Sequence, residues 1–384
     1  MKKCIANGKI LLKDKIIENY VIIFSEKIEK ILPVDKVNLS EYEVIDAKEN
    51  FVSPGFIDMH IHGYLGKDVS DGDADGIKIM AEGIAKNGVT SWCPTTMTVS
   101  KKEIENAFDA VRKVKNSSEY YGAKILGVNS EGPFINSKKK GAQAEEHILK
   151  PDADFIIENS DVVKLFTVAP EVDGALECIE KVNKNTNVLI SMGHTDATFE
   201  EAQKGINSGA KHTTHLFNAM TALTHRSPGV VGAALSDENV SVELIADTFH
   251  VNKGIFGLIA KIKEDKLCLI TDCIRAGGMP DGDYTLGGQP VHKEGIKCLM
   301  PDGTIAGSVL KLNEAVLNIY ENTEVKIYEA VNLASLNPAI ALKIDDRVGS
   351  IAEGKTADLV VFDEKISVLM TIIDGQIRYK GEKI

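Results

Sequence analysis

The chain has 384 residues, a formal net charge of −12 at pH 7 and the composition of an ordinary globular protein. The acidic balance argues against a general nucleic-acid-binding protein, and no apolar run is long enough to cross a bilayer. The N-terminal residues lack the apolar core of a signal peptide, and the six cysteines are scattered without a CxxC pair. We therefore expect a cytoplasmic protein with free thiols and with neither nucleic-acid nor membrane partners.

The first 50 residues predict short strands joined by turns. Apolar runs at 4–6, 9–12, 20–24, 27–32 and 42–46 have the length and composition of strands. Asn7-Gly8, between the first two runs, is typical of a hairpin turn. No segment of this part has a helical pattern.

From residue 51 the pattern changes to apolar runs that alternate with amphipathic stretches. The amphipathic stretches predict helices at 77–86, 101–114, 175–182, 199–206 and 253–262. Eight strand and helix units over roughly 250 residues fit a (β/α)8 barrel of the TIM type. A Rossmann fold is disfavoured because no G-x-G-x-x-G follows the first strand. The predicted strands lie at 52–62, 89–95, 124–130, 162–169, 188–192, 211–217, 240–246 and 267–271.

The last part of the chain returns to β structure. The Gly- and Pro-rich residues 277–289 predict a loop or hairpin excursion, and helices are expected at 310–320 and 327–334. Strand-like runs follow at 357–363 and 368–378, the latter with an Asp374-Gly375 hairpin turn. Neither end of the chain can bury a core alone. We therefore expect an α/β fold in which residues 1–51 and 345–384 form one small β-sandwich domain beside a barrel at 52–344.

Titratable residues stand at the ends of six predicted strands. Catalytic residues of such barrels gather at the C-terminal ends of the strands, and the coincidence across six ends carries more weight than any single residue. The first strand ends in two histidines, which lie on one face because the side-chain period of a strand is two. The candidates are His60, His62, Glu131, His194, His215, His250 and Asp272.

These residue types predict metal-assisted hydrolysis. A metal held by Glu131, His194 and His215 keeps an open position for water and lowers the pKa of that water. Asp272 beside the water can act as general base and then return the proton to the leaving group. An amide, an ester or a ring C–N bond is the natural substrate of such a site.

Other reactive residues are interpreted as structural. His212 and His215 lie an odd number of residues apart and would face opposite sides of a strand, so we assign His212 to packing or to the surface. His147 and His292 lie away from strand ends. Cys273 lacks the basic environment that would make it a nucleophile.

The pattern resembles the amidohydrolase superfamily over essentially the whole chain. The resemblance rests on His60-x-His62, the two later histidines and Asp272, and on residues 337–339 and 346–361. Four blocks are similar, more narrowly, to the members that deacetylate an amino-sugar phosphate. These blocks are Glu131-Gly132-Pro133-Phe134, Gly193-His194-Thr195, residues 214–220 and residues 269–272.

The resemblance implies hydrolysis of the acetamide of N-acetylglucosamine 6-phosphate to glucosamine 6-phosphate and acetate. It implies that Glu131, His194 and His215 bind the catalytic metal and that Asp272 is the acid and base. Some relatives carry amide side chains in place of both first-strand histidines and use one metal. Because both histidines are present here, we expect one or two divalent metals per subunit, the second on His60 and His62 with Glu131 bridging. Zinc, iron, manganese or cobalt would suit these ligands.

The resemblance also implies the substrate contacts. His250 would contact the sugar and help to polarise the carbonyl. Asn218, the backbone at Ala219 and Arg226 would hold the phosphate, with Arg226 reaching in from the partner subunit of a homodimer. Ala142 and Gln143 lie on a substrate-side loop, where some relatives carry a histidine at the position of Gln143.

Two other functions remain open. A different amidohydrolase, such as a cyclic amidase or a deacylase of N-acylated amino acids, would share the metal site but lack the phosphate-binding pair of Asn218 and Arg226. A non-catalytic barrel relative would tend to lose metal ligands, and none of the proposed ligands is missing here.

Overall fold

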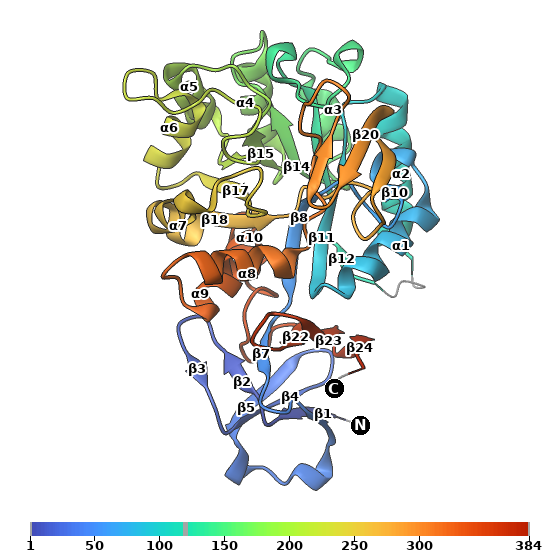
Figure 1. The fold of residues 1–384 in the computed structure, drawn as a ribbon, viewed down its shortest axis with the longest axis vertical. Coiled ribbons are helices and arrows are strands. Elements are labelled where there is room, and N and C mark those ends of the chain that lie inside the picture. The colour runs from blue at the N-terminus through green and yellow to red at the C-terminus, as the bar shows by residue number, and fades with distance from the viewer. Residues whose placement is uncertain (1, 118–121, 383–384) are drawn as a thin grey trace.

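A parallel barrel and a smaller β domain make up the computed structural model of the chain, which describes residues 2–117 and 122–382 (Figure 1). Neighbouring barrel strands pair in parallel and follow chain order. The predicted α/β barrel is therefore confirmed. Its strands are β8 (Phe56–Ile61), β11 (Val89–Thr96), β13 (Val128–Phe134), β14 (Val163–Val168), β15 (Leu189–Met192), β16 (His212–Thr213), β17 (Ser241–Ile245) and β18 (Leu267–Ile270).

The barrel closes through the residues that follow β18. Ile61 and Cys273 form a parallel bridge, and the Asp272 N–H donates to the His60 carbonyl at 2.9 Å. The His62 N–H donates to the Cys273 carbonyl, also at 2.9 Å. Closure therefore brings Asp272 beside the two histidines of the first strand.

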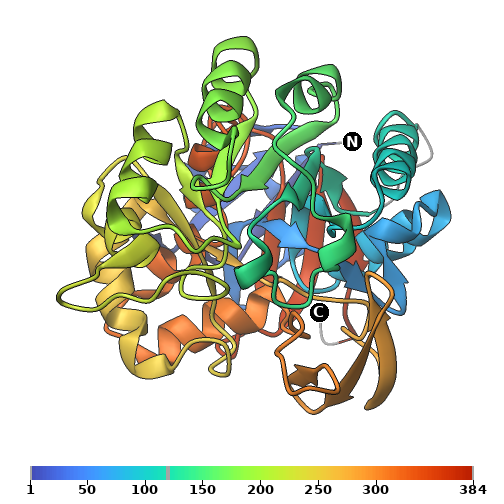
Figure 2. The ribbon, with the colours of Figure 1, turned by 90° about the horizontal axis from the view of Figure 1, so that it is seen from above.

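Helices surround the strands in a ring (Figure 2). The predicted helices appear as α1 (Ala74–Ala85), α2 (Lys101–Lys115), α4 (Ala175–Asn185), α5 (Phe199–Ser208), α7 (Phe256–Lys263), α8 (Leu312–Asn322) and α9 (Ile327–Leu333). Ser100 and Glu103 form a capping box at the start of α2, which fixes where that helix begins. Its apolar positions, among them Ile104 and Phe108, are buried against the barrel.

Three short helices were not expected from the sequence: α3 (Ala153–Glu158), α6 (Gly229–Ser236) and α10 (Leu336–Ala341). The α6 segment is almost entirely buried and apolar on all sides, so it carries no amphipathic signal. The excursion after the last barrel strand is a small antiparallel sheet, as the hairpin prediction required. It consists of β19 (Gly282–Leu286), β20 (Gln289–Glu294) and β21 (Lys297–Leu299).

Both ends of the chain contribute to the small domain, which lies below the barrel in Figure 1. One sheet has the order β5 (Ile28–Pro33), β4 (Tyr20–Phe24), β1 (Lys3–Ala6) and β6 (Glu43–Asp46). The other has the order β24 (Gln376–Lys380), β23 (Val368–Ile373), β22 (Leu359–Phe362), β7 (Phe51–Pro54), β2 (Lys9–Leu11) and β3 (Ile16–Ile17). Ile22 and Phe24 from the first sheet and Val52 and Met370 from the second share one core. The expected sandwich is thus present.

Several local predictions differ from the structure. The predicted strand at 124–130 is divided between β12 (Lys124–Ile125) and β13, and the predicted strand at 211–217 is only β16. The Asn7-Gly8 hairpin is wrong, because β1 and β2 lie in different sheets and the turn carries the chain between them. The run at 52–62 is two strands, since β7 pairs with β2 and β22 whereas β8 pairs with β11. Gly55 separates them, and a Cβ added there would lie 2.1 Å from Thr90 Oγ1. We propose that the domain boundary lies at Gly55.

Three further short strands are β9 (Gly63–Tyr64), β10 (Lys67–Asp68) and β12 (Lys124–Ile125). The Asp374-Gly375 turn joins β23 to β24 as predicted, with positive φ at both residues. All six cysteines are buried free thiols. Among the described residues, no helix has both the length and the hydropathy needed to cross a membrane.

Candidate metal centre

Five buried side chains converge at the C-terminal end of the barrel. They form two groups of three candidate ligands, and Glu131 belongs to both. Within each group the ligand atoms lie within 4.8 Å of one another. The first group adds His60 and His62, and the second adds His194 and His215. The structure therefore brings together every residue that the sequence nominated as a ligand.

Glu131 lies between the two groups. Its Oε1 is 2.9 Å from His215 Nε2 and 3.1 Å from His194 Nε2, and its Oε2 is 3.2 Å from His62 Nε2. Gly132 follows with a φ of 93°, and a Cβ added there would lie 2.1 Å from Thr98 Oγ1. Only glycine fits, so the turn behind Glu131 is fixed and the carboxylate is directed into the centre.

In three of the four histidines, an oxygen acceptor beside Nδ1 places the ring proton on that nitrogen. His60 Nδ1 lies 2.9 Å from Glu243 Oε2, His62 Nδ1 lies 3.2 Å from the Thr95 carbonyl, and His194 Nδ1 lies 2.9 Å from the Lys139 carbonyl. A carbonyl or a carboxylate only accepts, so Nδ1 donates and Nε2 presents its lone pair. This arrangement is typical of metal-binding imidazoles.

The donor set fits a divalent metal. His60 Nε2 and His62 Nε2 lie 3.3 Å apart, and His194 Nε2 and His215 Nε2 lie 3.1 Å apart. Lone pairs that face each other at these distances repel unless a cation or a proton lies between them. Imidazole and carboxylate ligands together suit zinc, iron, manganese and cobalt.

The electrostatics of the centre favour ionised carboxylates and positive charge. Burial would raise the pKa of Glu131, but His194 and His60 hold that pKa well below its usual value. Burial would lower the pKa of His60, but Glu243, Glu131 and Asp272 together raise it to about 9. A cation in this centre therefore meets carboxylates that are already charged.

Asp272 lies at the edge of the centre. Its Oδ1 is 3.3 Å from His62 Nε2 and 3.5 Å from His60 Nε2. Burial would raise the pKa of its carboxyl, but His60 and His62 lower it below the usual value. The neighbouring Cys273 is buried, and burial raises its thiol pKa well above the usual value, so a nucleophilic role is disfavoured.

Non-glycine residues with positive φ cluster around the centre. Such backbone conformations cost on the order of 1–3 kcal/mol each and persist only where the surroundings hold them. Here they bend the chain just after the barrel strands, so that side chains turn back over the barrel. These residues are His194 at 46°, His215 at 26°, Phe217 at 78°, Ala219 at 50°, Thr248 at 69° and Asp272 at 50°.

A cavity of about 370 Å³ opens over the candidate ligands. Its lining includes five of the six residues that the resemblance nominated for substrate contacts: Ala142, Gln143, Asn218, Ala219 and His250. The lining also includes residues that sequence reasoning missed, namely Met97, Lys138, Lys139, Leu286, Thr304, Ile305 and Gly307. The run of three lysines before Gly141 was a signal available in the sequence.

Arg226 is the one nominated substrate contact that is absent from the lining of this cavity. It lies on an exposed stretch between β16 and α6 and does not line this cavity. Within the described residues, no carboxylate forms an ion pair with its guanidinium.

Gln143 is hydrogen-bonded to Glu131, one of the candidate metal ligands. Its side chain is buried, its Oε1 accepts the Thr98 N–H at 2.6 Å, and its Nε2 donates to Glu131 Oε2 at 2.5 Å. The Thr98 contact fixes which end of the amide faces Glu131. Gln143 therefore orients Glu131, and a direct substrate contact stays a prediction.

His250 is held by an acid that sequence reasoning missed. His250 Nδ1 lies 2.7 Å from Asp247 Oδ2, while Asp247 Oδ1 accepts the backbone N–H groups of Phe249 and His250. The imidazole is thus fixed at the cavity through Nδ1, which leaves Nε2 as the nitrogen that could meet a substrate. An acid three residues before the histidine was the signal for this pair.

His212 is correctly placed in packing, but the reason given for it fails. β16 ends at Thr213, so His215 lies beyond the strand, and the alternation rule does not relate the two histidines. His212 is buried in the barrel, and its Nε2 lies 3.1 Å from Glu243 Oε1. Sequence reasoning missed Glu243 because it considered only the ends of strands.

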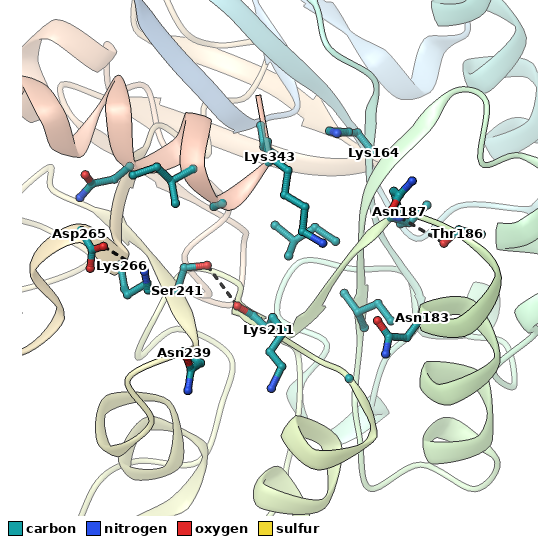
Figure 3. A pocket seen from close by; sticks show the side chains of 18 residues that line it. Lys164, Asn183, Thr186, Asn187, Lys211, Asn239, Ser241, Asp265, Lys266 and Lys343 are labelled. Atoms are coloured by element: carbon teal, nitrogen blue, oxygen red, sulfur yellow. Dashed lines mark hydrogen bonds and ion pairs between the residues drawn. The ribbon is translucent and has the colours of Figure 1, made fainter. Parts of the chain in front are cut away.

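A second cavity of about 240 Å³ lies at the opposite, N-terminal end of the barrel (Figure 3). It is lined by four lysines, Lys164, Lys211, Lys266 and Lys343, and it contains none of the candidate metal ligands. Active sites of such barrels lie at the C-terminal face. The chemistry therefore belongs to the cavity over Glu131.

The chain is similar to known proteins over nearly its whole length. The Amidohydrolase family matches residues 51–378. The N-acetylglucosamine-6-phosphate deacetylase of Bacillus subtilis is 37% identical over 378 residues, which cover 96% of this chain and 95% of that protein. The N-acetylgalactosamine-6-phosphate deacetylase of Escherichia coli O157:H7 is 36% identical over 339 residues, which cover 87% of this chain and 89% of that protein.

Solved structures agree with the sequence matches. The N-acetylglucosamine-6-phosphate deacetylase of Pasteurella multocida superposes with a TM-score of 0.93 at 30% identity, covering 98% of this chain and 99% of that chain. A variant of the Mycobacterium smegmatis deacetylase, in complex with N-acetyl-D-glucosamine-6-phosphate, has a TM-score of 0.90 at 27% identity. That alignment covers 99% of this chain and 100% of the other.

Proposed function

The chain belongs to the amidohydrolase family, and on that premise we propose that it hydrolyses the acetamide of N-acetylglucosamine 6-phosphate to glucosamine 6-phosphate and acetate. One observation carries the proposal. The cavity over Glu131, His194 and His215 has Asp272 at its edge, in a chain that matches such a deacetylase along 96% of its length.

The family is metal-dependent, and this chain has the residues to hold the metal. Glu131, His194 and His215 would bind one divalent ion, and His60 and His62, with Glu131 between them, would bind a second. When bound, the metal polarises the amide carbonyl and lowers the pKa of a water molecule toward neutrality. We propose zinc, iron, manganese or cobalt in these positions.

Asp272 moves the proton. Its carboxylate takes a proton from the water that attacks the carbonyl carbon, and then gives it to the amide nitrogen as the C–N bond breaks. Water thus supplies the new oxygen of acetate, and the amine leaves neutral. The depressed pKa of Asp272 means that the residue begins the cycle as the base.

The rest of the cavity would hold the sugar phosphate. His250, fixed by Asp247, faces the carbonyl or a hydroxyl through its Nε2. Asn218 and the backbone N–H of Ala219 would donate to the phosphate. Arg226 lies outside the cavity of its own chain, so we propose a homodimer in which Arg226 of each subunit reaches the other's cavity. We also propose a cytoplasmic location, which suits the six free thiols.

We expect acetate release from N-acetylglucosamine 6-phosphate that a chelator abolishes and a divalent metal restores. A coupled acetate assay should compare this substrate with N-acetylgalactosamine 6-phosphate, because a relative acting on that epimer is 36% identical. N-acetylglucosamine without the phosphate is the control. Equal rates with and without the phosphate would contradict a sugar-phosphate deacetylase and favour another amidohydrolase reaction.

Arg226→Ala is expected to raise KM for the phosphorylated substrate roughly 10- to 100-fold with little change in kcat, because it removes a hydrogen bond to a charged group. The unphosphorylated sugar should be turned over at an unchanged rate by the variant. Steady-state kinetics with both sugars measures this difference. Unchanged KM for the phosphate ester would remove Arg226 from the site.

A further inference from the structure

Besides Glu131, a second buried carboxylate contacts both groups of candidate ligands. Glu243 is the middle residue of β17, and its side chain is fully buried beneath the cavity. Its Oε2 lies 2.9 Å from His60 Nδ1 and accepts the backbone N–H of His215 at 3.0 Å. His60 belongs to one group and His215 to the other. One oxygen of Glu243 thus contacts both halves of the centre.

We propose that Glu243 is the positioning residue for the metal on the His60 side, holding that imidazole in the tautomer and orientation that bind it. The inference rests on the proposed two-metal function. Because a carboxylate only accepts hydrogen bonds, it keeps the proton on His60 Nδ1 and turns the Nε2 lone pair toward His62 Nε2, 3.3 Å away.

His60 differs from the other two oriented histidines in the charge of its partner. His62 and His194 donate to backbone carbonyls, whereas His60 donates to an anionic side chain. A carboxylate partner raises the basicity of a ligating imidazole. A buried carboxylate also requires positive charge nearby, and an ion on the His60 side supplies it through the imidazole.

The far side of Glu243 is also fixed. Its Oε1 lies 3.1 Å from His212 Nε2, and His212 Nδ1 lies 2.6 Å from Ser241 Oγ. Ser241 in turn contacts the Lys211 carbonyl at the N-terminal end of the barrel, where Figure 3 shows both residues. The hydrogen-bonded series from His60 to Ser241 therefore spans the barrel interior. Glu243 is held from both sides and cannot follow a misplaced His60.

Glu243→Gln tests the proposal in the metal-free full-length protein titrated with Mn²⁺ by calorimetry. The amide keeps the shape of the side chain, and its oxygen in the place of Oε2 can still accept from both the His215 N–H and His60 Nδ1, so this variant removes the negative charge and keeps the contacts. We expect two equivalents in the unsubstituted protein. In the variant, one equivalent should keep its affinity and the other should weaken roughly 10- to 100-fold, as for other partners of metal ligands. Glu238→Gln is the matched control, because this exposed residue precedes β17 and loses the same charge.

Glu243→Asp keeps the buried charge but shortens the side chain by one methylene, so it tests the position of the carboxylate, whereas Glu243→Gln tests its charge. It should show the same selective weakening. Unchanged affinities in Glu243→Asp would overturn the positioning role of Glu243, and unchanged affinities in Glu243→Gln would overturn the part played by its negative charge. Equal weakening of both equivalents would overturn the assignment to the His60 side. A single equivalent in the unsubstituted protein would overturn the two-metal centre together with this inference, whereas acetate release could still be normal.

Discussion

Asp272→Asn is expected to lower kcat for N-acetylglucosamine 6-phosphate by roughly 10²- to 10⁴-fold, the range that a positioned general acid and base contributes. Asparagine has the size of aspartate but cannot take a proton from water. The Asp272 carboxylate stands 3.3 Å from His62 Nε2 at the cavity edge, and its backbone N–H is held by the His60 carbonyl. The backbone contact does not depend on the side chain, so the variant should fold and should keep its metal.

Single-turnover kinetics together with metal analysis of the same samples would check this loss. Burial would raise the pKa of the Asp272 carboxyl, but His60 and His62 lower it, so the substitution removes an ionised carboxylate. Normal turnover by a metal-loaded Asp272→Asn protein would exclude the acid and base role.

The barrel was predictable because burial on both faces leaves near-continuous apolar strands. The same signal could not place the domain boundary. Residues 52–62 are buried throughout, and the close approach of Gly55 to Thr90 marks where they divide between two sheets. Asn7-Gly8 is a true turn, but local sequence does not specify which strand pairs with which. That choice depends on contacts with β6 and β7 about 40 residues away.

The candidate ligands were predictable from one geometric rule, that parallel strands of a barrel end at one face. The rule does not predict the groups that orient the ligands. Glu243 lies in the middle of a strand, and Asp247 acts through His250. The partner of His194 is the backbone carbonyl of Lys139, and no residue type in the sequence indicates a backbone contact. Gln143 shows that a residue can be placed correctly from the sequence while its contact is not predicted. Its position in a substrate-side loop was clear, but its contact with Glu131 depends on the Thr98 N–H, which only the folded chain supplies.

Glu131→Gln is expected to have the largest effect of any ligand substitution, because Glu131 is the residue shared by both groups. Glutamine replaces one carboxylate oxygen with an N–H donor. Oε1 faces His194 and His215 and lies 3.4 Å from His60 Nε2, whereas Oε2 faces His62 and already accepts from Gln143. Either orientation of the new amide therefore turns a donor toward at least one group and removes the negative charge from both.

The comparison with His60→Asn/His62→Asn makes the shared role of Glu131 measurable. The double variant removes ligands from one group only, so metal analysis should find one equivalent where the unsubstituted protein holds two. Glu131→Gln should hold substantially less than one equivalent. Its acetate release should fall by about 10³-fold or more, since a metal ion supplies several kcal/mol of transition-state stabilisation. If the double variant and the unsubstituted protein both bind one equivalent, the His60 and His62 pair does not hold a metal. If Glu131→Gln retains two, the carboxylate does not bridge, and the two groups are independent sites that happen to be neighbours.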